Sequence, residues 1–282
     1  MSHTPSSDYS DLSRPPLNES DLRSSLVRAG QMWSSISVVR QTGSTNDDLR
    51  AAIATDAPHG TILVAEEQVA GKGRLDRRWS APPRSSLTFS MLLRCPGRPP
   101  APWGWVPLAA ALAVCDALQR FEVAGVKLKW PNDVLVADKK VAGVLAELHS
   151  GRQADEVDAQ NIVIVGIGVN VSQAADELPS SVATSLALES ATTDRTAILR
   201  AILRGFQATL DQWQSGETAQ LRERYLDVSA TVGRSVNVEL PGGRQIQGRA
   251  VDIDSSGGLI VMDGSTRHAV AAADVTHASL AT

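Results

Sequence analysis

Three apolar runs close together in the middle of the chain place the strongest constraint on its fold. They cover residues 126–130, residues 134–136 continuing at 141–148, and residues 162–171. Short polar turns separate them, and this pattern is typical of neighbouring strands joined by tight connections. We therefore predict that these runs form adjacent strands of a central sheet with flanking helices, which is an α/β fold.

Two helical segments are expected beside this sheet. Apolar residues at spacings of three and four follow Pro107 as far as Leu118, and the same period recurs between residues 193 and 228. The first pattern places Cys115 in the buried stripe of a helix, so we expect a core thiol. Cys95 is the only other cysteine. Two cysteines are too few for a disulfide framework or a zinc site, which favours a reducing cytoplasm.

The pattern of apolar residues changes near residue 228. Beyond it, short alternating runs are separated by glycine turns such as Gly242-Gly243, a pattern typical of a small all-β module. Residues 1–20 are rich in Ser, Asp and Pro and have almost nothing to bury, as in a disordered tail. We predict three parts: a tail at 1–20, a larger domain at 21–228 and a β module at 229–282.

Composition excludes several classes of protein. The 282 residues carry 27 Lys and Arg against 31 Asp and Glu, a formal charge of −4, and 43% are apolar. No overall basic field is available to hold a polyanion such as DNA, so any phosphate binding must be local. No apolar stretch reaches the ~18–20 residues of a membrane span, and the first residues lack the features of a signal peptide. We expect a cytoplasmic protein that does not bind membranes.

A local concentration of positive charge stands out against this acidic background. Residues 71–78 contain four cations and one acid, together with Gly71 and Gly73, and Trp79 follows. Glycines let a backbone approach a ligand, and cations beside free N–H groups bind anions, so a phosphate-bearing ligand is one interpretation and a solvated surface loop is the other. The sequence contains no P-loop motif. Residues 166–170 begin like a dinucleotide-binding fingerprint but lack its third glycine.

Three further polar segments have both a structural and a ligand-binding interpretation. Asn132-Asp133 fits an ordinary turn. Ser44-Thr45 is followed by acids three residues on, a variant of the helix-capping pattern. Neighbouring strand residues point to opposite faces, so at most one of the pair Lys139-Lys140 can face a pocket beneath Gly143. A lysine beside a strand glycine suggests a ligand lying against the backbone.

In chain order, these segments resemble the biotin–protein ligase family over about residues 40–275. The matching segments are Gly43-Ser44-Thr45-Asn46, Glu66-Glu67-Gln68 with Gly71-Lys72-Gly73-Arg74 and Trp79, Lys129-Trp130-Pro131-Asn132-Asp133, Lys140 with Gly143 and Glu147, and residues 166–170. The resemblance implies an α+β catalytic domain built on a mixed sheet, of the biotin/lipoate ligase type related to class II aminoacyl-tRNA synthetases. A small C-terminal β-barrel of the Src-homology-3 type would follow it.

The resemblance also implies an activity. Members activate biotin with ATP and Mg²⁺ to biotinyl-5′-AMP, release pyrophosphate, and transfer biotin to a lysine of a biotin carboxyl carrier domain. The expected partners are therefore carrier domains of acetyl-CoA, acyl-CoA or pyruvate carboxylases. No dedicated metal ligands are expected, because Mg²⁺ would arrive with ATP.

Site residues follow from the same resemblance. The expected catalytic residues are Lys140, Arg74 and Asp133. Biotin is expected to contact Ser44, Thr45, Asn46, Gln68, Gly71, Lys72, Gly73, Arg74, Lys140 and Gly143. ATP or the adenylate is expected to contact Arg74, Arg77, Trp79, Asn132, Lys140 and Asn170.

Two departures from the family pattern bear on these expectations. Lys72 stands where many members carry Arg, which keeps the charge and loses the bidentate geometry. Repressor members carry an N-terminal winged helix-turn-helix of on the order of 60 residues, whereas 43 residues precede Ser44 here. We therefore expect a monofunctional enzyme that binds no DNA and is a monomer or a weak homodimer.

Two other functions remain open at this point. A lipoate or octanoate ligase would share the catalytic fold and the adenylation chemistry, and pyrophosphate exchange driven by biotin or by lipoate would separate the two. A non-catalytic biotin-sensing module would bind the adenylate without labelling a carrier domain. The presence of Lys140 argues against that module.

Overall fold

The computed structural model describes residues 13–75, 77–96, 102–150, 160–240, 242–271 and 274–277. A seven-stranded sheet forms the centre, in the order β1-β2-β5-β9-β8-β7-β6. Its first pair, β1 with β2, is parallel and the other neighbouring pairs are antiparallel. The strands are β1 (Ser35–Val39), β2 (Thr61–Ala65), β5 (Ser86–Pro96), β6 (Val126–Lys129), β7 (Asp133–Val136), β8 (Lys139–Ser150) and β9 (Gln160–Asn170). The prediction that the runs between residues 126 and 171 are adjacent strands of a central sheet is confirmed.

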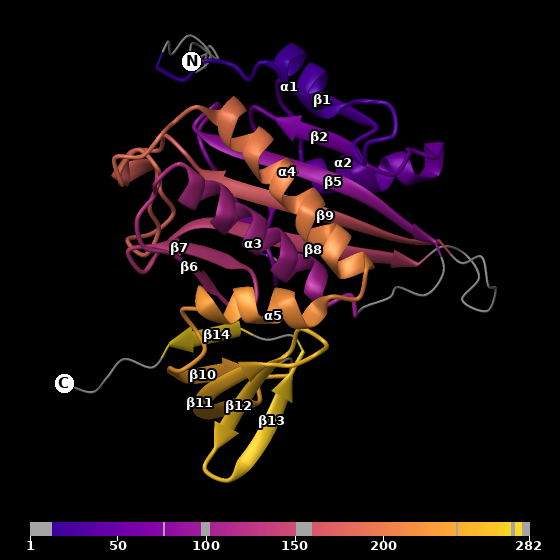
Figure 1. The fold of residues 1–282 in the computed structure, drawn as a ribbon. Coiled ribbons are helices and arrows are strands. Elements are labelled where there is room, and N and C mark those ends of the chain that lie inside the picture. The colour runs from indigo at the N-terminus through magenta and orange to yellow at the C-terminus, as the bar shows by residue number, and fades with distance from the viewer. Residues whose placement is uncertain are drawn as a thin grey trace.

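Helices cover both faces of this sheet. α3 (Trp105–Arg120) and α4 (Arg195–Gln214) pack on each other across one face (Figure 1), and α3 is buried along almost its whole length. On the other face, Leu49 of α2 (Thr45–Ala52) packs on Leu92 and Ile164. Alternate strand residues point to opposite faces, so the neighbours Met91 and Val165 join the core under α3 and α4.

The cysteines lie in this core. Burial raises the pKa of the Cys95 thiol to about 11. For Cys115, burial and then the charge of Asp116 raise the thiol pKa to about 12. Both side chains are therefore protonated and unreactive at neutral pH, and the predicted core position of Cys115 is confirmed.

The C-terminal part is a five-stranded antiparallel sheet in the order β13-β12-β11-β10-β14. It follows α5 (Thr218–Asp227), and in Figure 1 it sits beneath that helix. The boundary near residue 228 stays a proposal; it falls where helix gives way to strand. The strands are β10 (Ser235–Glu239), β11 (Gln245–Ile253), β12 (Leu259–Asp263), β13 (Thr266–Val270) and β14 (Asp274–His277).

The turn between β11 and β12 packs against the larger domain. The indole N–H of Trp105 donates to the carbonyl of Ser255, and that of Trp130 donates to the carbonyl of Gly257, each at 3.0 Å. A Cβ at Gly104 would lie 2.2 Å from the carbonyl oxygen of Ser256. The backbones therefore meet at a distance that only glycine permits.

The N-terminal prediction needs a correction. Residues 1–12 lie outside the described residues, but the expected tail does not extend to residue 20. Leu17 is buried, and α1 (Glu19–Leu26) packs beside β1. Glu19 accepts the N–H of Val38 at 3.3 Å, and Arg23 donates to the carbonyl of Ile36 at 3.2 Å. The polar composition concealed Leu17, which joins Leu22 and Leu26 of α1 in the core. Charged side chains of α1 bond to backbone groups of the edge strand β1.

No helix in the part of the chain that the structure describes is long and apolar enough to cross a membrane.

Candidate active site

A cavity of about 260 Å³ opens between the loop that joins β2 to β5 and the strands β7, β8 and β9. The C-terminal sheet contributes Val275 and Thr276 to its wall. Every predicted site residue except Gly71 lines this cavity. These residues are Ser44, Thr45, Asn46, Gln68, Lys72, Gly73, Arg74, Arg77, Trp79, Asn132, Asp133, Lys140, Gly143 and Asn170.

A chain of hydrogen bonds crosses one end of the cavity. Oε1 of Gln68 accepts from the backbone N–H of Thr45 at 2.7 Å and from its hydroxyl at 3.0 Å. The Thr45 hydroxyl also lies 2.6 Å from that of Ser90, which donates to Oδ1 of Asn46 at 2.6 Å. Nδ2 of Asn46 donates to Glu147 at 2.6 Å. The wall thus presents hydroxyl and amide groups in fixed orientations.

Helix capping does not account for Ser44 and Thr45. Ser44 is the N-cap residue of α2, but its side chain makes no capping hydrogen bond. The acids that suggested capping have other partners: Asp47 pairs with Lys72 at 2.7 Å, and Asp48 accepts from the hydroxyl of Thr42 at 2.5 Å. The two hydroxyl residues are buried against the cavity instead.

Three glycines form the floor of the cavity. A Cβ at Gly166 would lie 2.2 Å from Oδ1 of Asn46, and a Cβ at Gly168 would lie 2.5 Å from the ring of Trp79. At Gly143 the nearest atoms are the side-chain end of Lys140, at 3.1 Å. The absence of a side chain therefore lets these groups rest on the sheet. Gly166 and Gly168 were not predicted, because their role depends on residues more than 80 positions away.

The positively charged segment around residues 71–79 forms a small hairpin beside the cavity, made of β3 (Gly71–Lys72) and β4 (Arg78–Trp79). Gly71 faces this hairpin: a Cβ there would lie 2.4 Å from the carbonyl oxygen of Trp79. Arg74 reaches Oδ1 of Asn132 at 3.2 Å. The interpretation of this segment as a solvated surface loop is therefore wrong for Arg74 and Trp79. Asp76 lies outside the described residues.

Lys140 and Asp133 meet at the start of β8. Lys140 Nζ lies 2.6 Å from Asp133 Oδ1, and both side chains are partly buried. The neighbouring Lys139 is exposed, so the prediction that at most one of the two lysines faces the pocket is confirmed. Asn132 donates to the carbonyl of Val144 at 3.1 Å, which fixes its amide beside the pair.

The far end of the cavity holds Trp79 and Asn170. Asn170 donates to the carbonyl of Thr184 at 2.9 Å and accepts from Gln173 at 3.1 Å. Within the described structure, the indole N–H of Trp79 is buried and has no hydrogen-bond partner. A buried donor without an acceptor is costly, so a ligand with an acceptor atom at this end would compensate it.

Comparison with known proteins assigns the family. Residues 38–170 match the model of the "Biotin/lipoate A/B protein ligase family", and residues 231–277 match that of the "Biotin protein ligase C terminal domain". The biotin–[acetyl-CoA-carboxylase] ligase of Mycobacterium tuberculosis is 42% identical over 271 residues, which is 95% of this chain and 98% of that protein. This chain belongs to the biotin protein ligase family.

Two further relatives extend the comparison. The bifunctional ligase/repressor BirA of Escherichia coli is 28% identical, over 80% of this chain and 69% of that protein. The structure of a biotin protein ligase from Aquifex aeolicus in complex with biotin and ATP superimposes with a TM-score of 0.72 at 27% identity. That match covers 87% of this chain and all of the Aquifex chain.

The charge around this biotin ligase cavity is strongly positive. Asp133 is the only carboxylate among the described lining residues, against six cations: Lys72, Arg74, Arg77, Arg78, Lys129 and Lys140. His277 adds no further charge at neutral pH, because desolvation and then the charges of Lys129 and Arg234 lower its pKa, while Asp138 opposes them. In a chain of net charge −4, this concentration makes the cavity a local site for anions.

No group of three or more His, Cys, Asp or Glu side chains in the described ranges could hold a metal ion. The donors that line the cavity suit an anionic ligand. A magnesium ion held mainly by the phosphates of a nucleotide fits this set, because Mg²⁺ is usually bound by few protein carboxylates together with substrate phosphates.

Proposed function

We propose that this protein joins biotin to ATP as biotinyl-5′-AMP, releases pyrophosphate, and transfers the biotinyl group to a lysine of a carboxylase carrier domain. One observation carries the proposal: a single cavity combines a hydrogen-bonding wall of hydroxyl and amide groups with six cations, one of which, Lys140, is paired with Asp133. The Mycobacterium and Aquifex relatives, named as biotin ligases, support it.

The polar wall would bind the head of biotin. The ureido ring offers two N–H donors and one carbonyl acceptor, which the hydroxyl and amide groups of Thr45, Asn46 and Gln68 can pair. The apolar bicyclic ring would rest on Gly143 and Gly166, where no Cβ intervenes. Lipoate lacks a ureido group and would leave buried polar atoms unpaired, which strongly favours biotin.

The cations would carry the first reaction. A biotin carboxylate oxygen attacks the α-phosphorus of ATP, the bond to the β-phosphate oxygen breaks, and pyrophosphate leaves. Two like charges at ~4 Å repel by about 4 kcal/mol at an effective dielectric of 20. Lys140 and Arg74 would offset this repulsion where charge develops. Magnesium, bound to the phosphates, would neutralise part of the charge that leaves with pyrophosphate.

Asp133 would serve the second reaction. An acceptor lysine with a pKa of ~10.4 is mostly protonated at neutral pH and must lose a proton before it attacks. Asp133 would accept that proton, the lysine nitrogen would bond to the biotinyl carbonyl carbon, and AMP would leave. Trp79 and Asn170 would hold the adenine end, and the buried indole N–H of Trp79 supports a ligand acceptor there.

The partners belong to the same proposal. We infer carrier domains of acetyl-CoA, acyl-CoA or pyruvate carboxylases as acceptors, action in the cytoplasm as a monomer or weak dimer, and no binding to DNA. Light scattering and a gel shift with candidate operators would test the oligomeric state and the absence of DNA binding.

A transfer assay tests the function. Purified protein is incubated with an apo carrier domain, biotin, ATP and magnesium, and the carrier is probed with streptavidin. We expect labelling that requires every component. In parallel, biotin should drive exchange of pyrophosphate into ATP and lipoate should not. Exchange with lipoate alone would establish a lipoate ligase, and adenylate binding without labelling would establish a non-catalytic module.

A further inference from the structure

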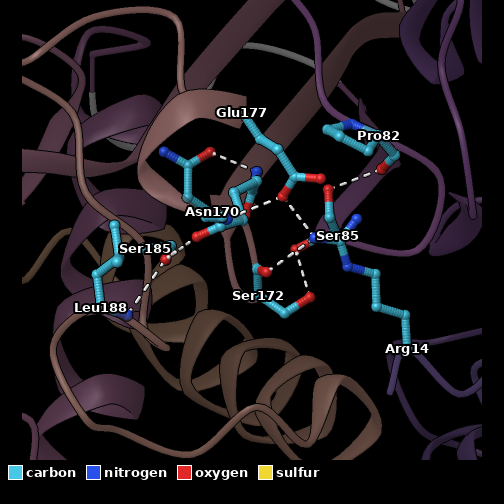
Figure 2. A network of polar contacts seen from close by, with 10 residues as sticks. Arg14, Pro82, Ser85, Asn170, Ser172, Glu177, Ser185 and Leu188 are labelled. Carbon is cyan, nitrogen blue, oxygen red and sulfur yellow. Dashed lines mark hydrogen bonds and ion pairs between the residues drawn. The ribbon is translucent and has the colours of Figure 1, made fainter. Parts of the chain in front are cut away.

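The loop that follows β9 is fastened by a residue from the start of the chain (Figure 2). Arg14 donates to the carbonyl of Ser172 at 3.1 Å and to Oε2 of Glu177 at 2.5 Å. The same carboxylate oxygen accepts the backbone N–H of Ala174 at 2.8 Å. One guanidinium and one carboxylate therefore close the loop of residues 172–177 on itself and on the N-terminal segment.

This closed loop contains the residue that orients Asn170. Gln173 is buried, and its amide donates to Oδ1 of Asn170 at 3.1 Å. The other side of the Asn170 amide donates to the carbonyl of Thr184. The orientation of the Asn170 side chain in the cavity thus depends on where the 172–177 loop holds Gln173.

The loop also contacts the turn that follows Trp79. The carbonyl of Ser85 accepts the N–H of Ser172 at 2.8 Å and that of Val171 at 3.2 Å. The hydroxyl of Ser85 donates to the carbonyl of Pro82 at 2.7 Å, which fixes the turn itself. Figure 2 shows these bonds converging beside Arg14 and Glu177. Both elements of the adenine end are therefore attached to one network.

The segment that carries Arg14 is itself rigidly held. We call residues 14–17 the N-terminal strap. The carbonyl of Pro15 accepts from Arg195 at 2.6 Å, and the N–H of Leu17 donates to Glu66 at 2.7 Å. Arg195 and Glu66 are buried and paired at 2.6 Å. Two charges taken out of water need well-made partners, and the strap supplies a hydrogen bond to each.

We propose that Arg14 is a positioning residue for the nucleotide end of the cavity. It acts through the 172–177 loop, which sets the orientation of Asn170 and braces the turn after Trp79. The inference rests on the proposed function, because the role of Asn170 toward ATP is part of that proposal. Arg14 does not line the cavity in the described structure. Substituting it should therefore weaken ATP binding and leave biotin binding nearly unchanged.

Steady-state kinetics of the full chain test this. Biotin-dependent pyrophosphate exchange gives KM for ATP, KM for biotin and kcat. We expect Arg14→Ala to raise KM for ATP about tenfold, the scale of one lost charge-assisted hydrogen bond. KM for biotin should stay within about twofold. Arg14→Lys should recover part of the loss, because it keeps the charge opposite Glu177 without the forked geometry.

A binding measurement separates positioning from folding. Calorimetry with α,β-methylene-ATP in the presence of biotin should show the same loss of affinity for Arg14→Ala without any turnover. Arg23→Ala, which removes an α1 arginine that does not touch the loop, is the matched control and should bind the analogue as the original chain does. Unchanged ATP affinity in Arg14→Ala would overturn the proposal, and so would an equal effect on biotin.

The two proposals fail in different ways. If the unsubstituted chain shows no biotin-dependent exchange, the proposed function fails before any variant is compared. If exchange is normal and Arg14→Ala behaves like Arg23→Ala, only the role of the strap is rejected.

Discussion

Lys140 and Asp133 form an ion pair across the neighbouring strands β7 and β8, with Nζ 2.6 Å from Oδ1. The pair places a cation and a carboxylate side by side in the wall of the cavity. The proposed function assigns the cation to activation and the carboxylate to transfer. Substituting the two residues separately should therefore slow different steps.

Lys140→Ala should slow adenylate formation by about 100-fold or more, the effect of losing one preorganised charge at a reacting phosphate. Biotin-dependent pyrophosphate exchange measures this step without an acceptor. Lys139→Ala is the matched control, because Lys139 lies next to it in β8 and is exposed. Equal rates for the two variants would contradict the assignment.

Asp133→Asn should leave exchange largely intact and slow transfer by about 100-fold, the usual scale for a general base. The measurement is single-turnover transfer from preformed biotinyl-5′-AMP to an apo carrier domain. The deficit should shrink as the pH rises, because more of the acceptor lysine is then already deprotonated. Normal transfer at neutral pH would remove Asp133 from this role.

Gly168→Ala should displace the ring of Trp79, since the new Cβ would lie 2.5 Å from it. Stacking of an aromatic side chain on a base contributes about 1–3 kcal/mol, so ATP affinity should fall roughly tenfold while biotin affinity changes little. Gly205→Ala in α4 is the control. Its Cβ would lie 3.5 Å from the carbonyl of Ala113, an ordinary contact, and it should leave ATP affinity unchanged.

Asp254→Asn should destabilise the protein in a pH-dependent way. Desolvation raises the Asp254 pKa, but hydrogen bonds from Ser256 and Gly258 and the charge of Arg267 outweigh it, so the folded-state pKa lies below 3.8. The ionised carboxylate therefore stabilises the fold above pH 3.8, and this contribution is lost as the pH falls through the folded-state pKa.

The expected cost of this substitution at neutral pH is about 1 kcal/mol, kept small by solvent screening. Urea unfolding of both proteins at neutral pH and near pH 3 measures it, and the difference should shrink at the lower pH. Asp263→Asn, at the exposed end of β12, should change stability by less than about 0.5 kcal/mol. A difference that grows toward acid would contradict the sign.

The sequence predicts those parts of the fold that depend on local residue patterns. Short turns join β6 to β7 and β7 to β8 as sequential neighbours, and strict alternation indicates the C-terminal strands. The position of β1 and β2 was not predictable, because a parallel pair depends on a long crossover that leaves no local pattern. The N-terminal strap was missed for a related reason: Arg14 and Glu177 are 163 residues apart, and neither belongs to a recognisable motif.

The candidate site was predicted more completely than the sheet order. Its residues cluster in short segments that together resemble the biotin–protein ligase family, and that resemblance implied Lys140, Asp133 and Arg74. The roles of these residues stay predictions. Ser90 was not predicted, because a serine inside an apolar strand gives no signal until Thr45 and Asn46 are placed beside it.

The β11–β12 turn limits how this enzyme can be divided. A fragment ending near residue 228 would lack the carbonyl groups that accept the indole N–H of Trp105 and of Trp130. It would also lack Val275 and Thr276, which line the cavity. We therefore expect that the larger domain cannot be used on its own without loss of stability and of part of the cavity wall. A protein engineer who wanted a smaller biotin-labelling enzyme would have to redesign both tryptophans before removing the C-terminal strands.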